Sequence, residues 1–253
     1  MRHFILFSFF MAASCSLTAQ TPPNWTRQSS FIQQEYDAFR YASDRIYAHR
    51  ACEGIDVYEL NNLSEVRLLN QIAAPADALV ALHIHGETLF RLTENALHTY
   101  SLADRDQPVE TAVYDLSHVA HVRNMAVVDD MITVLTENYR GGGFFVRFNR
   151  NAVDPRPTTI EIPDYPGYDR EVINILVKDT IFYVIPRGSG TKIVELVSES
   201  EARYLGNIQG ISSPYNGAFL PNDDFLVLDS GSGFYVFDVS NPEEPFLLGR
   251  DRR

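Results

Sequence analysis

The stretch GFYVFDVSNP at residues 233–242, preceded by FLVLD at 225–229, indicates how the whole chain is organised. It holds two apolar runs of strand length and ends in a polar turn that contains proline. Runs similar to 233–239 recur upstream at separations of 42 to 47 positions: GIDVYEL (54–60), ALHTYSL (96–102), GFFVRFN (143–149) and GTKIVEL (190–196). A period of about 40 to 50 residues predicts a repeat architecture.

A second repeating feature, which we call the acid column, lies upstream of each run. It consists of an acidic residue, then any residue, then an aliphatic residue. Its members are Asp44 with Ile46, Glu87 with Leu89, Asp130 with Ile132, Asp179 with Ile181, and Asp224 with Leu226. The acid is typical of a tight turn, and the aliphatic residue is typical of the start of a strand. Nothing in the repeat has the period of a helix.

Four short strands in each of five repeats predict an all-β fold, a β-propeller with five four-stranded antiparallel blades. A β-sandwich also has short strands, but its sequence would not repeat at every fourth strand. We expect blades near residues 36–72, 77–116, 121–162, 170–208 and 215–249. An N-terminal extension (20–35) with the single tryptophan, Trp25, is a candidate edge strand or plug for closing the propeller, and 250–253 is expected to be a frayed tail.

The last repeat, FLVLD (225–229) followed by GFYVFDVSNP (233–242), resembles the LVIVD repeat of β-propellers that bacteria export. The first repeat keeps GIDVYEL (54–60), whereas the middle three keep the spacing and polarity but lose the DVSNP ending. The resemblance implies a propeller fold and a location outside the cytoplasm. The family has no shared catalytic motif, so the resemblance implies no particular function.

The first nineteen residues have the layout of a secretory signal peptide. A basic start (1–3) precedes an apolar run of ten residues (4–13) and a small, polar stretch (14–19), and ten residues are too few to span a bilayer. Cleavage after Ala19 would give a soluble chain, whereas a lipobox-like sequence before Cys15 would give a lipid-anchored one. We expect an exported protein that is periplasmic, associated with the outer membrane or secreted. Only Cys52 then remains as a free thiol, so no intramolecular disulfide is expected.

The composition is that of a globular protein with an acidic balance. Of 253 residues, 45% are hydrophobic, and 33 acidic residues against 21 basic ones give a formal net charge of −12. Such a chain lacks the positive electrostatic potential that binding to nucleic acids or to anionic membranes requires. We therefore expect no nucleic-acid partner. No run after residue 20 approaches about 18 apolar residues, so no transmembrane span is expected.

The candidate binding residues come from one end of the predicted blades. In an up-and-down blade, the turn between the second and third strands and the link to the next blade emerge at the same end, where binding usually occurs. The candidates there are Tyr139, Arg140, Tyr165, Tyr168, Arg170, Arg187 and Tyr215. Tyrosine and arginine dominate binding hot spots, so we expect an envelope protein or a glycan as partner. The alternative is that these residues only reflect the Tyr and Arg content of exported loops.

A carbohydrate-active hydrolase is the competing function, because two carboxylates opposed across the centre of a propeller can cleave a glycosidic bond. The candidate acids are Glu94 and Glu137, from twin LTEN stretches, and Asp229 at the equivalent place in the last repeat. Their repetition favours a role in turns, so we expect no catalytic residue. A purely structural surface protein is the third interpretation.

Other candidate sites are weaker. His83 and His85 would share one strand face, but no third ligand stands at metal-finger spacing, and His118 and His121 have no partner identifiable from the sequence. The glycine-rich stretches at 141–143 and 188–190 precede strands rather than helices, so they predict no phosphate site. We expect no cofactor and no metal.

Overall fold

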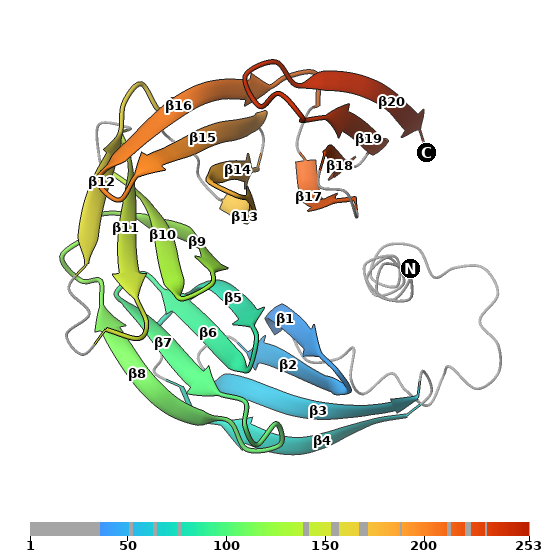
Figure 1. The fold of residues 1–253 in the computed structure, drawn as a ribbon. Helices are drawn as coiled ribbons and strands as arrows, with labels where there is room; N and C mark the ends of the chain where they lie inside the picture. The colour runs from blue at the N-terminus through green and yellow to red at the C-terminus, as the bar shows by residue number, and fades with distance from the viewer. Residues whose placement is uncertain are drawn as a thin grey trace. The chain divides into compact units, whose positions relative to one another are not determined.

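The computed structural model describes residues 36–50, 53–62, 65–74, 77–138, 142–152, 157–166, 172–187, 189–211, 214–220, 224–230 and 232–252. In these residues twenty strands form five four-stranded antiparallel sheets, and there is no helix (Figure 1). This arrangement confirms the predicted all-β fold, a five-bladed β-propeller. No helix long and apolar enough to cross a membrane is found within these ranges.

The chain divides into two compact units, residues 1–74 and 75–253. The first unit carries blade 1, whose strands are β1 (Tyr36–Ala42), β2 (Arg45–Arg50), β3 (Gly54–Asn62) and β4 (Glu65–Ile72). They pair in sequence order. On one face of this sheet Ile46, Ala48 and Tyr58 form a small buried cluster.

The second unit carries blades 2 to 5. Blade 2 consists of β5 (Leu79–His85), β6 (Thr88–Thr93), β7 (Ala96–Ser101) and β8 (Val109–Asp115). Blade 3 consists of β9 (Val122–Val128), β10 (Met131–Glu137), β11 (Gly143–Asn149) and β12 (Thr158–Ile162). Blade 4 consists of β13 (Val172–Lys178), β14 (Ile181–Pro186), β15 (Thr191–Ser198) and β16 (Glu201–Ile208). Blade 5 consists of β17 (Pro214–Phe219), β18 (Phe225–Ser230), β19 (Gly233–Asp238) and β20 (Phe246–Arg252).

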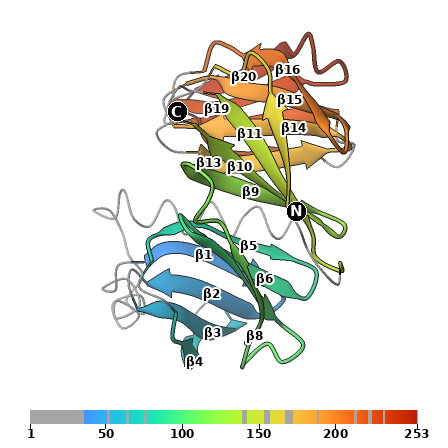
Figure 2. The same ribbon diagram turned by 90° about the vertical axis from the view of Figure 1, so that its left-hand side faces the viewer.

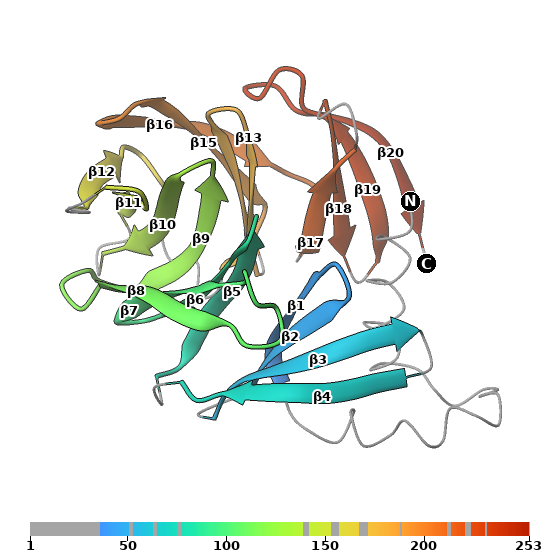
Figure 3. The ribbon, with the colours of Figure 1, turned by 60° about the horizontal axis from the view of Figure 1, so that its bottom comes forward.

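The blades of the second unit contact one another through their first strands, β5 with β9, β9 with β13 and β13 with β17 (Figure 1). Figure 3 shows blade 5 as a fan that runs from β17 outward to β20. Strand β20 continues to Arg252, which pairs with Gly233. Residues 250–252 therefore belong to a blade rather than to the frayed tail expected from the sequence.

The acid column lies in the connection between the first two strands, as predicted. In blades 1 to 4 this connection is a two-residue turn whose first residue has a positive φ: Ser43 (58°), Gly86 (57°), Asp129 (50°) and Asp179 (52°). Glycine and short polar residues tolerate this left-handed conformation. In blade 4 the acid of the column, Asp179, takes the first turn position, whereas in blades 1 to 3 the acid takes the second.

A backbone hydrogen bond joins the two sequence columns in every blade. An N–H near the end of the third strand or just after it donates to a carbonyl between the first two strands, at 2.8–3.0 Å. The donor and acceptor pairs are Leu60 with Asp44, Leu102 with Glu87, Arg150 with Asp130, Leu196 with Thr180, and Val239 with Asp224. The shared contact explains why the two columns recur together.

A glycine opens or directly precedes the third strand in blades 1, 3, 4 and 5, and we call Gly54, Gly143, Gly190 and Gly233 the glycine column. A Cβ added to Gly143 would lie 2.6 Å from the ring of Tyr165, and one added to Gly190 would lie 2.5 Å from the carbonyl oxygen of Ile208. Real Cβ atoms do not approach other atoms this closely, so the glycine column reflects close packing at the start of the strand.

The core of the second unit lies between neighbouring blades. Ile132 and Val134 of β10 pack in a cluster shared with blade 2, whereas Leu135 packs in a cluster shared with blade 4. Across that second interface the rings of Phe145 and Phe182 lie 4.7 Å apart. Figure 2 shows the strands of blades 3 and 4 side by side. Side chains alternate between the two faces of a strand, so each strand needs apolar residues at successive positions.

Candidate functional site

The predicted binding end can be located from the strand order. In each antiparallel blade the second strand ends, the third strand begins and the fourth strand ends at the same end, and the next blade starts there. We call this end of blades 2 to 5 the link end. It carries the turns and the blade links from which the candidate residues were chosen.

The side chains of five of the seven candidate binding residues lie outside the described part of the structure. Tyr139, Arg140, Tyr168 and Arg170 lie outside the described residues, and Tyr215 lies in β17 with its side chain outside them. Arg187 is exposed directly after β14. Tyr165 is described and is only 5% exposed. No contact joins the side chains of Arg187 and Tyr165 among those that the described structure shows.

Tyr165 packs inside the interface between blades 3 and 4. The Nζ of Lys192 lies 4.4 Å from the centre of its ring, and the ring of Tyr204 meets it edge-on at 6.2 Å. The ring also covers Gly143. Tyr165 thus acts in packing, and it offers a partner little surface.

Lys192 is a buried cation, with 3% of its surface exposed. Its Nζ donates to the carbonyl oxygen of Pro166 at 2.5 Å. A buried ammonium group needs such compensation, which the carbonyl and the ring of Tyr165 supply. The contact ties the start of the third strand of blade 4 to the link that leads into this blade.

Arg123 and Glu137 form a second charged contact at the link end. The Nε of Arg123 lies 3.0 Å from Oε2 of Glu137, whose side chain is 1% exposed. The backbone N–H of Glu137 also donates to the carbonyl of His121 at 3.1 Å. Glu137, one of the three acids of the hydrolase interpretation, therefore belongs to a buried ion pair, which is the arrangement of a structural carboxylate.

The other two acids differ in their surroundings. Glu94 is exposed in the turn between β6 and β7, where Thr93 caps the backbone through bonds with Asn95 and Ala96. Asp229 lies on β18 opposite Asn216 of β17 and is half-buried. Glu94 and Glu137 thus share a sequence pattern but not an environment.

A β-bulge near the start of the first strand recurs in all five blades. The ladder between the first two strands skips one residue in each: Asp37, Val80, Arg123, Ile173 and Tyr215. Bulges redirect side chains and are common next to functional sites. Two residues of interest, Arg123 of the ion pair and the candidate Tyr215, occupy this position.

The residue after the bulge is asparagine in blades 3, 4 and 5, and we call Asn124, Asn174 and Asn216 the asparagine row. Each Oδ1 accepts the N–H of the following residue, at 2.7–2.9 Å. The Nδ2 of Asn124 donates to the carbonyl of Val172 at 2.7 Å, and the Nδ2 of Asn174 donates to Oδ1 of Asn216 at 3.0 Å. The row thus links the first strands of three blades.

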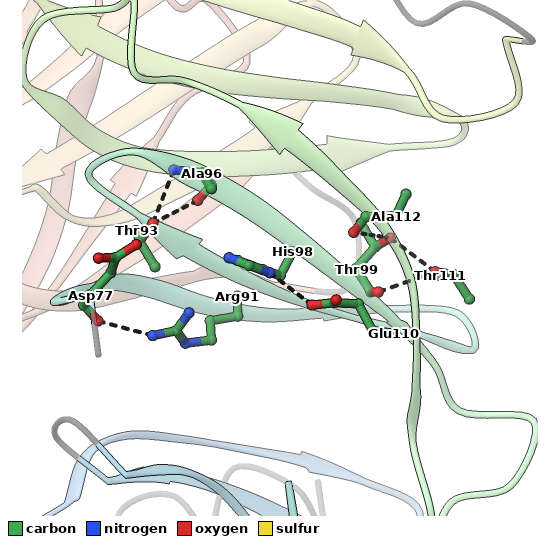
Figure 4. Close-up of polar contacts among 9 residues, drawn as sticks. All are labelled: Asp77, Arg91, Thr93, Ala96, His98, Thr99, Glu110, Thr111 and Ala112. Carbon is green, nitrogen blue, oxygen red and sulfur yellow. Dashed lines mark hydrogen bonds and ion pairs between the residues drawn. The ribbon is translucent and has the colours of Figure 1, made fainter. Parts of the chain in front are cut away.

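Blade 2 holds a separate polar network, shown in Figure 4. The buried Arg91 donates from Nη2 to the carbonyl of Asp77 at 2.9 Å, and Nδ1 of His98 lies 2.8 Å from Oε1 of Glu110. Burial lowers the pKa of Arg91. Burial, followed by the charge of Glu110, raises the pKa of Tyr100 to about 12. The network thus gives Nη2 of Arg91 and the imidazole of His98 polar partners within the second unit.

The histidines form no metal site in the described part of the chain. There, no group of three or more His, Cys, Asp or Glu side chains is arranged to hold a metal ion. The ring of His83 lies 6.5 Å from that of Phe90.

The asparagine row was not predicted, although the sequence carries a signal for it. The three asparagines end the stretches VRN (122–124), VIN (172–174) and PYN (214–216), which lie six, five and eight positions before the acids of their repeats. The signal is hidden because the equivalent position is alanine in blades 1 and 2 (Ala38 and Ala81).

The chain shares its fold with several solved structures, although its sequence matches no known family. No protein-family model matches the chain, and no curated protein matches its sequence. A candidate 6-phosphogluconolactonase from Bacteroides fragilis has a TM-score of 0.67 at 12% identity, over 86% of this chain and 70% of that one. A protein of unknown function from Desulfotomaculum acetoxidans has a TM-score of 0.63 at 16% identity, over 82% of this chain and 66% of that one.

A designed protein, Ika8, shares the fold with a TM-score of 0.56 at 13% identity. The match covers 87% of this chain and 63% of Ika8, so the chain spans less than two thirds of the designed protein. At identities this low the likeness concerns the backbone alone. The comparisons therefore show a fold that this chain shares with proteins of different descriptions.

Proposed function

We propose that the chain is an exported, non-catalytic β-propeller that binds a protein or a glycan of the bacterial cell envelope through the link end of blades 3 to 5. One observation carries the proposal: buried polar contacts gather at this end. They are the Arg123–Glu137 pair, the contact of Lys192 with Pro166 and the asparagine row.

These contacts favour binding because they hold the base of the turns and links in place. A ligand site on loops is effective when the loops are held by rigid neighbours, since less conformational entropy is lost on binding. Lys192 and the ring of Tyr165 hold the link that leads toward Tyr168 and Arg170. The exposed Arg187 lies at the same end. We therefore assign Tyr165 a supporting role and keep the other candidates as contact residues.

Export is part of the proposal. It rests on the signal-like layout of residues 1–19 and on the resemblance of the last repeat to exported LVIVD propellers. Intact mass measurement of the protein from a membrane and a soluble fraction tests it. A mature chain that starts at Gln20, or one that starts at a lipidated Cys15, agrees with export; an unprocessed Met1 chain in the cytoplasm contradicts it.

The binding role is tested by capture from a bacterial envelope extract. The variant Tyr168→Ala/Arg170→Ala should lose a partner that the wild type retains, with an unchanged thermal midpoint. Tyr41→Ala/Arg105→Ala is the matched control, because both side chains are exposed and neither belongs to a turn or link of the link end. Equal capture by both variants would remove the assigned site. Release of reducing sugar from the extract by the wild type would contradict the non-catalytic part.

A further inference from the structure

We draw no further inference here: the strongest candidate, the exposed apolar patch that Phe246, Leu247 and Leu248 form at the start of β20, the outer strand of blade 5, carries none because nothing in the structure shows what covers it.

Discussion

Arg123→Met should strongly destabilise the protein. The side chain of Glu137 is 1% exposed, and the guanidinium 3.0 Å away neutralises its charge. Methionine preserves much of the apolar stem but leaves the carboxylate without this cation. Removing one partner of a buried ion pair costs about 3–5 kcal/mol, because the remaining charge stays desolvated.

The size of the effect follows from exposure. The side chain of Arg123 is 18% exposed, so water screens part of the interaction and the lower end of the range, about 3 kcal/mol, is expected. For a chain of this length, each kcal/mol lowers the thermal midpoint by about 2–4 °C. We therefore expect a loss of about 6–12 °C in a melt followed by circular dichroism, together with a lower urea midpoint.

Two further variants show whether the unpaired charge is the cause. Arg123→Met/Glu137→Met leaves no charge behind and should recover most of the lost stability. Arg203→Met makes the same change in an exposed pair, where the guanidinium lies 2.7 Å from Glu195, and should cost at most about 1 kcal/mol. The reasoning is refuted if Arg123→Met costs no more than Arg203→Met, or if the double variant is as unstable as the single one.

Three other substitutions test the packing. Gly143→Ala should lower stability by about 1–3 kcal/mol in urea unfolding, because its Cβ would lie 2.6 Å from the ring of Tyr165; an unchanged urea midpoint contradicts this close packing. Asn174→Ala should cost about 1–2 kcal/mol, since it removes two hydrogen bonds at the bulge, and a melt no lower than that of Asn151→Ala argues against the row. Tyr183→Phe should keep or raise the thermal midpoint at pH 7, because the buried hydroxyl has no partner in the described structure. Burial raises the pKa of Tyr183 from 10.0 to about 12, so the wild type should lose stability relative to the Phe variant as the pH rises from 10 to 12, and parallel urea midpoints over that range would count against it.

The fold could be predicted because its constraints repeat in every blade. The glycine column marks a steric limit, as at Gly143, and the acid column marks turns that need a left-handed residue, as at Asp129 and Asp179. Both constraints recur from blade to blade, so they leave similar residue types at a similar spacing, although blade 2 has Ala96 in place of the glycine. The extent of β20 could not be predicted, because its last residues pair through their backbone, which makes little demand on side chains.

The site was harder to predict because its contacts join residues from different elements. Tyr165 has the residue type of a contact residue, yet Lys192, 27 positions away, holds its ring in the interior. Glu94 and Glu137 stand in identical LTEN stretches, but Arg123 buries one of them in an ion pair and the other is exposed. Sequence patterns report residue type and period, whereas these roles depend on which side chains lie across the blade interface.

The asparagine row separates what the fold requires from what it does not. The same bulge occurs in all five first strands, yet the residue after it is Ala38 in blade 1 and Ala81 in blade 2. The bulge therefore does not need an asparagine to form. Asparagine in blades 3 to 5 must then serve the contacts that its side chain makes between blades, from Asn124 to Val172 and from Asn174 to Asn216. A residue type that the backbone does not demand therefore reports how neighbouring blades are joined rather than how each blade folds.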